Sequence, residues 1–282
     1  MAVTIAHKSI TISGGVTLRY QEAGAGKPLV MLPGWSQSAA EFKYQIAKFV
    51  EHRRVIALDQ RGHGESDKPA GGYRIARLAA DLREVLIALD LSDVDLLGHS
   101  MGCSVSWSYL DLFGPERLSR LILVDEAAVV TGNPSWPESE REALDCLFAD
   151  PVALAAQYQN VLGATDAEAV ADLLAGMFTP GVAREDLVWI GGENLKMPRQ
   201  HAADLVYHHV LIDWRDLIPT IRLPTLVVGG DVSIFSARSQ HWLAEQIPGA
   251  ECVIFGADEG GSHFMFYENP EKFNAVVEGF LG

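Results

Sequence analysis

The sequence predicts an α/β fold in which helices cover both faces of a mostly parallel central sheet. Short apolar runs alternate along the chain with segments whose apolar residues recur at helical spacing. Fully apolar runs are typical of strands buried on both faces of a parallel sheet. Their alternation with helices indicates βαβ units with right-handed crossovers, and this pattern is interrupted once, between residues 127 and 219.

The first part of the chain supplies a hairpin and the first βα units. Residues 5–22 alternate in polarity like two strands joined at Ser13-Gly14-Gly15. The segments expected next are strands at residues 29–32, 54–58, 94–97 and 118–124, and helices at residues 38–50, 75–89 and 101–113. The last of these helices is expected to end at Gly114-Pro115, because proline has no backbone N–H to continue it.

The interruption predicts a helical cap inserted into an α/β core. We expect the core to comprise residues 1–126 and 220–282, and the cap residues 127–219. Helical spacing within the cap covers residues 137–148, 151–162, 167–177 and 199–210. Candidates for the wall of a substrate pocket are Trp35, His99, Trp136 and Trp189. Packing of cap against core is the competing explanation for the aromatic side chains.

The βα pattern resumes after the cap. An apolar strand is expected at residues 223–231, followed by a helix at 236–246, a strand at 251–255 and a closing helix at 268–281.

The composition of the chain argues against nucleic acids and membranes as binding partners. The 282 residues carry a formal net charge of −15, which argues against nucleic acid because phosphates would be repelled. No run of eighteen apolar residues is present, and the N-terminus does not resemble a signal peptide. The three cysteines show no paired spacing. We therefore expect a soluble, cytoplasmic protein that acts on a small molecule, without a membrane or nucleic acid as partner.

The segment Gly98-His99-Ser100-Met101-Gly102 has the spacing of a nucleophile elbow. A strand that turns directly into a helix crowds the positions two before and two after the turn residue, so both must be small. Ser100 would then be exposed at the turn. The backbone N–H groups of Met101 and of Trp35, which follows Pro33-Gly34, are the expected donors to an oxyanion.

A serine nucleophile needs a base and a carboxylate that orients the base. The order Ser100, Asp231, His263 suits a triad built on such a sheet, and Asp125 is a competing carboxylate. Because no spacing such as H-E-x-x-H occurs, we expect neither a metal nor another cofactor. The histidines expected at the surface are His7, His52, His201, His208, His209 and His241.

Taken together, these motifs resemble the α/β-hydrolase superfamily over nearly the whole chain. The matching segments are residues 29–35, 58–66, 98–102, 121–125, 224–231, 261–264 and 268–270. The resemblance implies Ser100 as nucleophile, His263 as base, Asp231 as acid and a cap after Asp125. It specifies the fold closely and the substrate poorly, since the superfamily hosts many chemistries.

Three features depart from the usual pattern of the superfamily. Pro33-Gly34-Trp35 replaces the usual His-Gly and resembles the cofactor-independent dioxygenases of 3-hydroxy-4-oxoquinolines, in which the acid partner occupies the position of Asp125. The residue after the elbow serine is histidine in those enzymes and Met101 here. Gly229-Gly230-Asp231 is tighter than the usual G-x-x-D, although the distance from Asp231 to the following helix still favours this residue. The third feature is serine at the elbow, which argues against haloalkane dehalogenases and epoxide hydrolases, where the resemblance would lead one to expect aspartate.

The sequence therefore predicts a serine hydrolase that cleaves a carboxylic ester, lactone or related acyl bond through an acyl-enzyme. The alternative is a cofactor-free dioxygenase that opens a 3-hydroxy-4-oxoquinoline-type ring with a dyad of His263 and Asp125. A third hypothesis is a ligand receptor that retains the fold without turnover.

Overall fold

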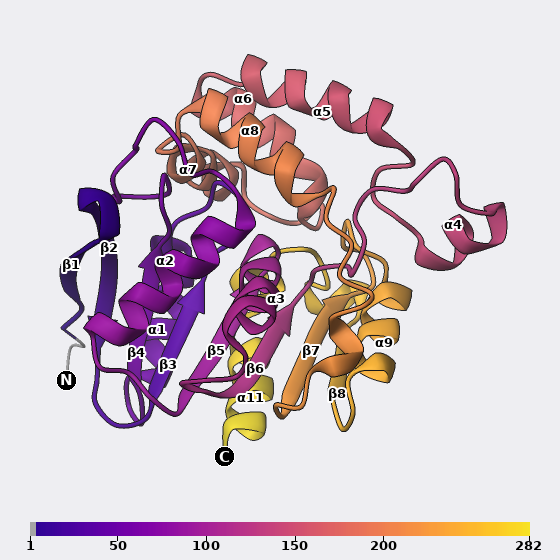
Figure 1. The fold of residues 1–282 in the computed structure, drawn as a ribbon. Helices are drawn as coiled ribbons and strands as arrows, with labels where there is room; N and C mark the ends of the chain where they lie inside the picture. The colour runs from indigo at the N-terminus through magenta and orange to yellow at the C-terminus, as the bar shows by residue number, and fades with distance from the viewer. Residues whose placement is uncertain (1–3) are drawn as a thin grey trace.

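A computed structural model describes residues 4–282 and contains an eight-stranded sheet with the order β1-β2-β4-β3-β5-β6-β7-β8 (Figure 1). The strands are β1 (Ala6–Ile12), β2 (Val16–Ala23), β3 (Pro28–Leu32), β4 (Arg54–Asp59), β5 (Val94–His99), β6 (Leu118–Val124), β7 (Thr225–Gly230) and β8 (Glu251–Phe255). β2 pairs antiparallel with β1 and with β4, and the other neighbours are parallel. The expected α/β fold with a mostly parallel sheet is confirmed.

Helices cover both faces of the sheet. The helices of the core are α1 (Lys43–Phe49), α2 (Ile75–Ala88), α3 (Met101–Phe113), α9 (Ala237–Gln246), α10 (Met265–Glu268) and α11 (Pro270–Leu281). Apolar residues of α2, α3 and α9 belong to one hydrophobic cluster, and those of α1, α10 and α11 to another. The two clusters explain the fully apolar run in β3, because Val30 and Leu32 contribute to the first, and Leu29 and Met31 to the second.

The segment between β6 and β7 is helical. It contains α4 (Glu138–Leu144), α5 (Pro151–Gly163), α6 (Ala167–Leu174), α7 (Arg184–Asn194) and α8 (Arg199–His209). Figure 1 shows α5, α6, α7 and α8 above the carboxyl ends of the parallel strands, with α4 at the side of this group. These helices therefore cover the edge at which the loops after β3, β5 and β6 emerge.

Between β6 and β7, the helix α7 is absent from the sequence-based expectations. Its interior contains Gly191-Gly192, which breaks the apolar pattern. Gly191 is needed for packing, because a Cβ atom there would lie 2.5 Å from the carbonyl oxygen of Ala167 at the start of α6. Contact between two helices, and not local spacing, therefore explains this part of the sequence.

The structure has no helix within residues 4–282 that is long and apolar enough to cross a membrane.

Candidate active site

Ser100 occupies a sharp turn between β5, which ends at His99, and α3, which begins at Met101. Its φ of 51° and ψ of −123° are costly for a residue with a side chain, and such strain persists only where the surroundings enforce it. The flanking residues Gly98 and Gly102 allow this tight turn, because any larger side chain at either position would clash. A Cβ atom at Gly98 would lie 2.5 Å from the backbone of Gly102, and one at Gly102 would lie 2.5 Å from Leu32 O. The predicted elbow is therefore present, with its serine lining a cavity.

His263 reaches the same cavity from the loop that follows β8. Only 2% of its surface is exposed, and its backbone N–H donates to Met177 O in the cap at 3.0 Å. His99 supports the loop from below, because its Nε2 donates to the carbonyl oxygen of His263 at 2.8 Å. The imidazole is thus held from the core and from the cap.

The carboxylate that contacts His263 is Asp125, with 2.6 Å between Oδ2 and Nδ1 of the imidazole. Asp125 directly follows β6, has a φ of 53° and is completely buried. The Ser233 hydroxyl donates to the same Oδ2. Burial raises the pKa of Asp125 above its usual value, while the hydrogen bonds from His263 and Ser233 oppose that rise.

The expectation that Asp231 orients His263 is wrong for this structure. Asp231 is exposed, and its backbone N–H donates to Phe255 O at 2.9 Å. A Cβ atom at Gly230, the last residue of β7, would lie 2.0 Å from Gly261 O, so β7 ends directly against the loop that carries His263. Two residues after Asp231, the Ser233 hydroxyl donates to Asp125. The competing carboxylate, Asp125, is therefore the one beside the imidazole.

The two expected oxyanion donors flank the elbow. Met101 is the first residue of α3, where a backbone N–H has no acceptor within the helix. Trp35 lies in the loop after β3, and a Cβ atom on its neighbour Gly34 would lie 3.1 Å from Ser100 Cβ. Gln37 holds this loop by accepting the Gly34 N–H at 3.0 Å. Met101 is thus next to Ser100 in the chain, and Gly34, the neighbour of Trp35, is next to it in space.

The cavity has a volume of about 180 Å³ and a mostly apolar wall. Cap residues such as Leu174 and Val206 and the loop residue Phe235 line it together with Ser100 and His263. Such a site, apolar with a few converging polar groups, suits a small organic molecule.

Of the four expected wall residues, only Trp35 lines this cavity. Its indole N–H donates to Ala202 O of α8 at 2.7 Å, so the side chain also connects the loop after β3 to the cap. His99 is completely buried beneath the cavity. Trp136 packs under the guanidinium of Arg215, and Trp189 stacks on Tyr267 with ring centroids 6.0 Å apart. For Trp136 and Trp189, packing is the correct explanation.

The prediction that His209 lies at the surface is also wrong. This residue is 4% exposed and lines the cavity, whereas His208 beside it is exposed. Helical spacing was the available signal, because Ala202, Leu205 and Val206 precede His209 at intervals of seven, four and three residues and are all buried.

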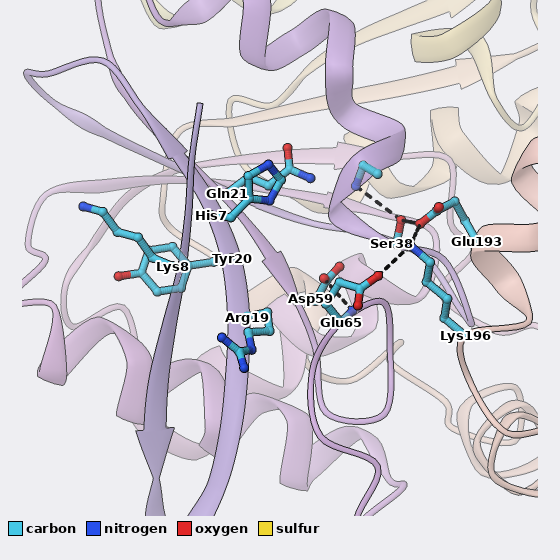
Figure 2. A pocket seen from close by; sticks show the side chains of 11 residues that line it. His7, Lys8, Arg19, Tyr20, Gln21, Ser38, Asp59, Glu65, Glu193 and Lys196 are labelled. Atoms are coloured by element: carbon cyan, nitrogen blue, oxygen red, sulfur yellow. Dashed lines mark hydrogen bonds and ion pairs between the residues drawn. The ribbon is translucent and has the colours of Figure 1, made fainter. Parts of the chain in front are cut away.

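A second cavity of about 390 Å³ is polar and lies beside the β1–β2 hairpin (Figure 2). Ser38 Oγ donates to Glu193 at 2.6 Å, and Lys196 lies 2.8 Å from both Glu193 and Glu65. Figure 2 shows these groups bonded to one another between the cap and the loop after β3. None of the triad candidates lines this cavity, so we interpret it as a cap-to-core junction.

The comparisons with known proteins identify the fold family of the chain. Residues 27–270 match the family model described as alpha/beta hydrolase fold. A non-heme chloroperoxidase of Streptomyces lividans is 28% identical, over 97% of this chain and 99% of its own. An AB hydrolase superfamily protein of Bacillus subtilis is also 28% identical, over 94% and 95%. The solved structure of an esterase from Exiguobacterium antarcticum has a TM-score of 0.86 at 26% identity and covers 98% of this chain and 100% of its own.

Proposed function

Because the chain belongs to the α/β-hydrolase fold family, we propose that it cleaves a carboxylic ester, lactone or related acyl bond of a small molecule through an acyl-enzyme. The observation that carries the proposal is one apolar cavity lined by both the elbow serine and a histidine that is paired with a buried carboxylate. The esterase of similar structure supports the same chemistry.

In the proposed reaction, His263 Nε2 removes the hydroxyl proton of Ser100 while Oγ attacks the carbonyl carbon of the substrate. Asp125 accepts the Nδ1–H of His263, which sets the tautomer and stabilises the imidazolium that forms. The N–H groups of Trp35 and Met101 stabilise the oxyanion, each by about 3 kcal/mol of barrier. His263 then protonates the leaving alkoxide, and water releases the acyl group from Ser100 by the reverse sequence.

The proposal is tested by intact mass spectrometry with an ester that deacylates slowly. The wild type should gain the mass of the acyl group, and Ser100→Ala should not. The Ser9→Ala variant, which changes an exposed serine of β1 far from the cavity, is the control and should still be acylated. Turnover of esters by Ser100→Ala at the wild-type rate would exclude the mechanism.

A second candidate is a cofactor-free dioxygenase that acts on a 3-hydroxy-4-oxoquinoline-type ring. The observation that favours it is the pairing of His263 with Asp125, the carboxylate position that the resemblance to those enzymes implied. In this reaction, the dyad would deprotonate the ring hydroxyl, and oxygen would then be consumed with little dependence on Ser100. An oxygen electrode with hydroxyquinolones distinguishes the two: uptake retained in Ser100→Ala supports the dioxygenase, and no uptake by the wild type excludes it.

A further inference from the structure

The loop that carries His263 packs directly against a segment of the cap, residues 177–179, that follows α6. The backbone N–H of His263 donates to Met177 O at 3.0 Å. The next residue, Phe264, stacks its ring on that of Phe178, with centroids 4.2 Å apart and 12° between the ring planes. Both rings are buried. The cap therefore contacts the backbone of the candidate base and the side chain of its neighbour.

Glu268, the last residue of α10, links the other side of this loop to the same cap segment. Its Oε1 accepts hydrogen bonds from the Ser262 hydroxyl and, at 3.0 Å, from the backbone N–H of Thr179. Its Oε2 accepts the hydroxyl of Thr179. Ser262 is completely buried, and its Oγ also accepts the backbone N–H of Phe264 at 3.0 Å. One carboxylate thus connects the residue before His263 to the cap.

The loop needs such contacts because two glycines precede Ser262. Gly260 has a φ of 72°, and glycine loses more conformational freedom on folding than any other residue. The core supplies part of the restraint, since the backbone N–H of Val232 donates to Gly261 O at 2.9 Å. Glu268 adds a link from the following residues to the cap.

The proposed chemistry makes the position of this loop critical. Nε2 of His263 must reach the hydroxyl of Ser100 while Nδ1 stays bound to Asp125. Ser100 and Asp125 directly follow β5 and β6 of the core, whereas the loop of His263 is held in part by the cap. A displacement of about 1 Å in a reacting group can reduce a rate by about 10². A shift of residues 177–179 would therefore disturb the alignment of the base with its two partners.

We propose that Glu268 is a positioning residue that connects the cap to the loop of the base and so keeps His263 aligned with Ser100. The cap is then part of the catalytic arrangement and not only a cover over the cavity. Substrate binding depends instead on the residues that line the cavity, and Glu268 and Thr179 are not among them. Loss of the link should therefore lower kcat and leave KM nearly unchanged. This inference rests on the proposed function, because it concerns the base of that reaction.

Steady-state hydrolysis of phenyl esters from acetate to hexanoate tests the proposal. Glu268→Ala removes the link and should lower kcat by about 10–100-fold, with KM within about threefold of the wild type. Glu268→Gln keeps a carbonyl oxygen at the same place and should recover most of that loss. Thr179→Val removes only the hydroxyl on the cap side and should lower kcat by about fivefold. Thr165→Val, at an exposed threonine of the same cap, is the matched control and should keep the wild-type kcat.

Two further measurements separate positioning from a general loss of stability. Thr179→Val should have no additional effect on kcat in the Glu268→Ala background, because both substitutions break the same link. The contact of 2.6 Å between His263 and Asp125 holds a proton, which should give a low-field NMR signal that is absent from His263→Ala. Glu268→Ala and Thr179→Val should shift that signal, and Thr165→Val should leave it in place.

A wild-type kcat in Glu268→Ala would overturn the inference, and so would a loss that appears only in KM. If circular dichroism shows that Glu268→Ala is unfolded, Thr179→Val decides in its place, and an unchanged kcat with an unchanged low-field signal overturns the positioning role. If the wild type cleaves no ester but the signal responds to Thr179→Val and not to Thr165→Val, ester cleavage is refuted and the positioning of His263 is supported.

Discussion

Asp125→Asn is the substitution that most directly tests the proposed catalytic arrangement. Oδ2 of Asp125 accepts hydrogen bonds from both His263 and Ser233 in a completely buried position. An amide placed there can donate to Nδ1 of the imidazole, which leaves the ring hydrogen on Nε2. A protonated Nε2 cannot accept the proton of Ser100. The amide also lacks the charge that stabilises the imidazolium.

The expected loss follows from these contacts. Hydrogen bonds to a charged group contribute about 1.5–3 kcal/mol each, so weakening two of them in the transition state costs about 3–6 kcal/mol. At about 1.4 kcal/mol per factor of ten, kcat/KM should fall by roughly 10²–10⁴. Replacement of the carboxylate behind a triad histidine by an amide lowers kcat by about 10⁴, which is the upper end of this range.

The assay is steady-state hydrolysis of whichever ester the wild type turns over, with melting temperatures to confirm folding. Asp231→Asn is the control, and its rate should stay within about twofold of the wild type because Asp231 is exposed and does not touch the imidazole. A large loss in Asp231→Asn together with a nearly normal rate in Asp125→Asn would refute the assignment of the carboxylate.

Three further outcomes concern stability. Gly98→Ala should lower the free energy of unfolding by more than about 2 kcal/mol in urea titrations, because its Cβ would lie 2.5 Å from the backbone of Gly102; an unchanged midpoint would contradict the crowding argument. Gly192→Ala in α7 should instead stabilise by about 0.5–1 kcal/mol and raise the melting temperature, since no atom lies within 4 Å of the added methyl and alanine favours the helix. His63 should make stability depend on pH, because burial lowers its pKa to about 4 while Nδ1 donates to Arg61 O. His63 binds a proton more readily in the unfolded chain than in the folded one. Its contribution to the free energy of unfolding is therefore fully present above pH 6.5 and decreases by roughly 3 kcal/mol as the pH drops towards 4. His63→Asn should flatten the urea-derived stability curve between these pH values, and an equally steep curve would rule out His63 as its source.

The sequence by itself determined the features that depend on neighbouring residues. The apolar run at residues 29–32 predicts a strand covered on both faces, because each residue in turn contributes to the opposite cluster. The elbow was equally predictable, since the steric conflict that requires Gly98 and Gly102 arises within a few residues of Ser100. The boundaries of α3 and β6 follow from the same kind of local pattern.

Only the tertiary structure decided which carboxylate faces His263 and which histidine faces the cavity. Asp125 and Asp231 both follow a strand at the same edge of the sheet, but only Asp125 contacts the imidazole of His263, 138 residues away in the chain, whereas Asp231 is exposed. His209 became part of the cavity wall because α8 packs over the elbow, where Ser104 and Glu126 receive its ring. Such contacts join distant parts of the chain, so the spacing of residues within a single segment cannot predict them.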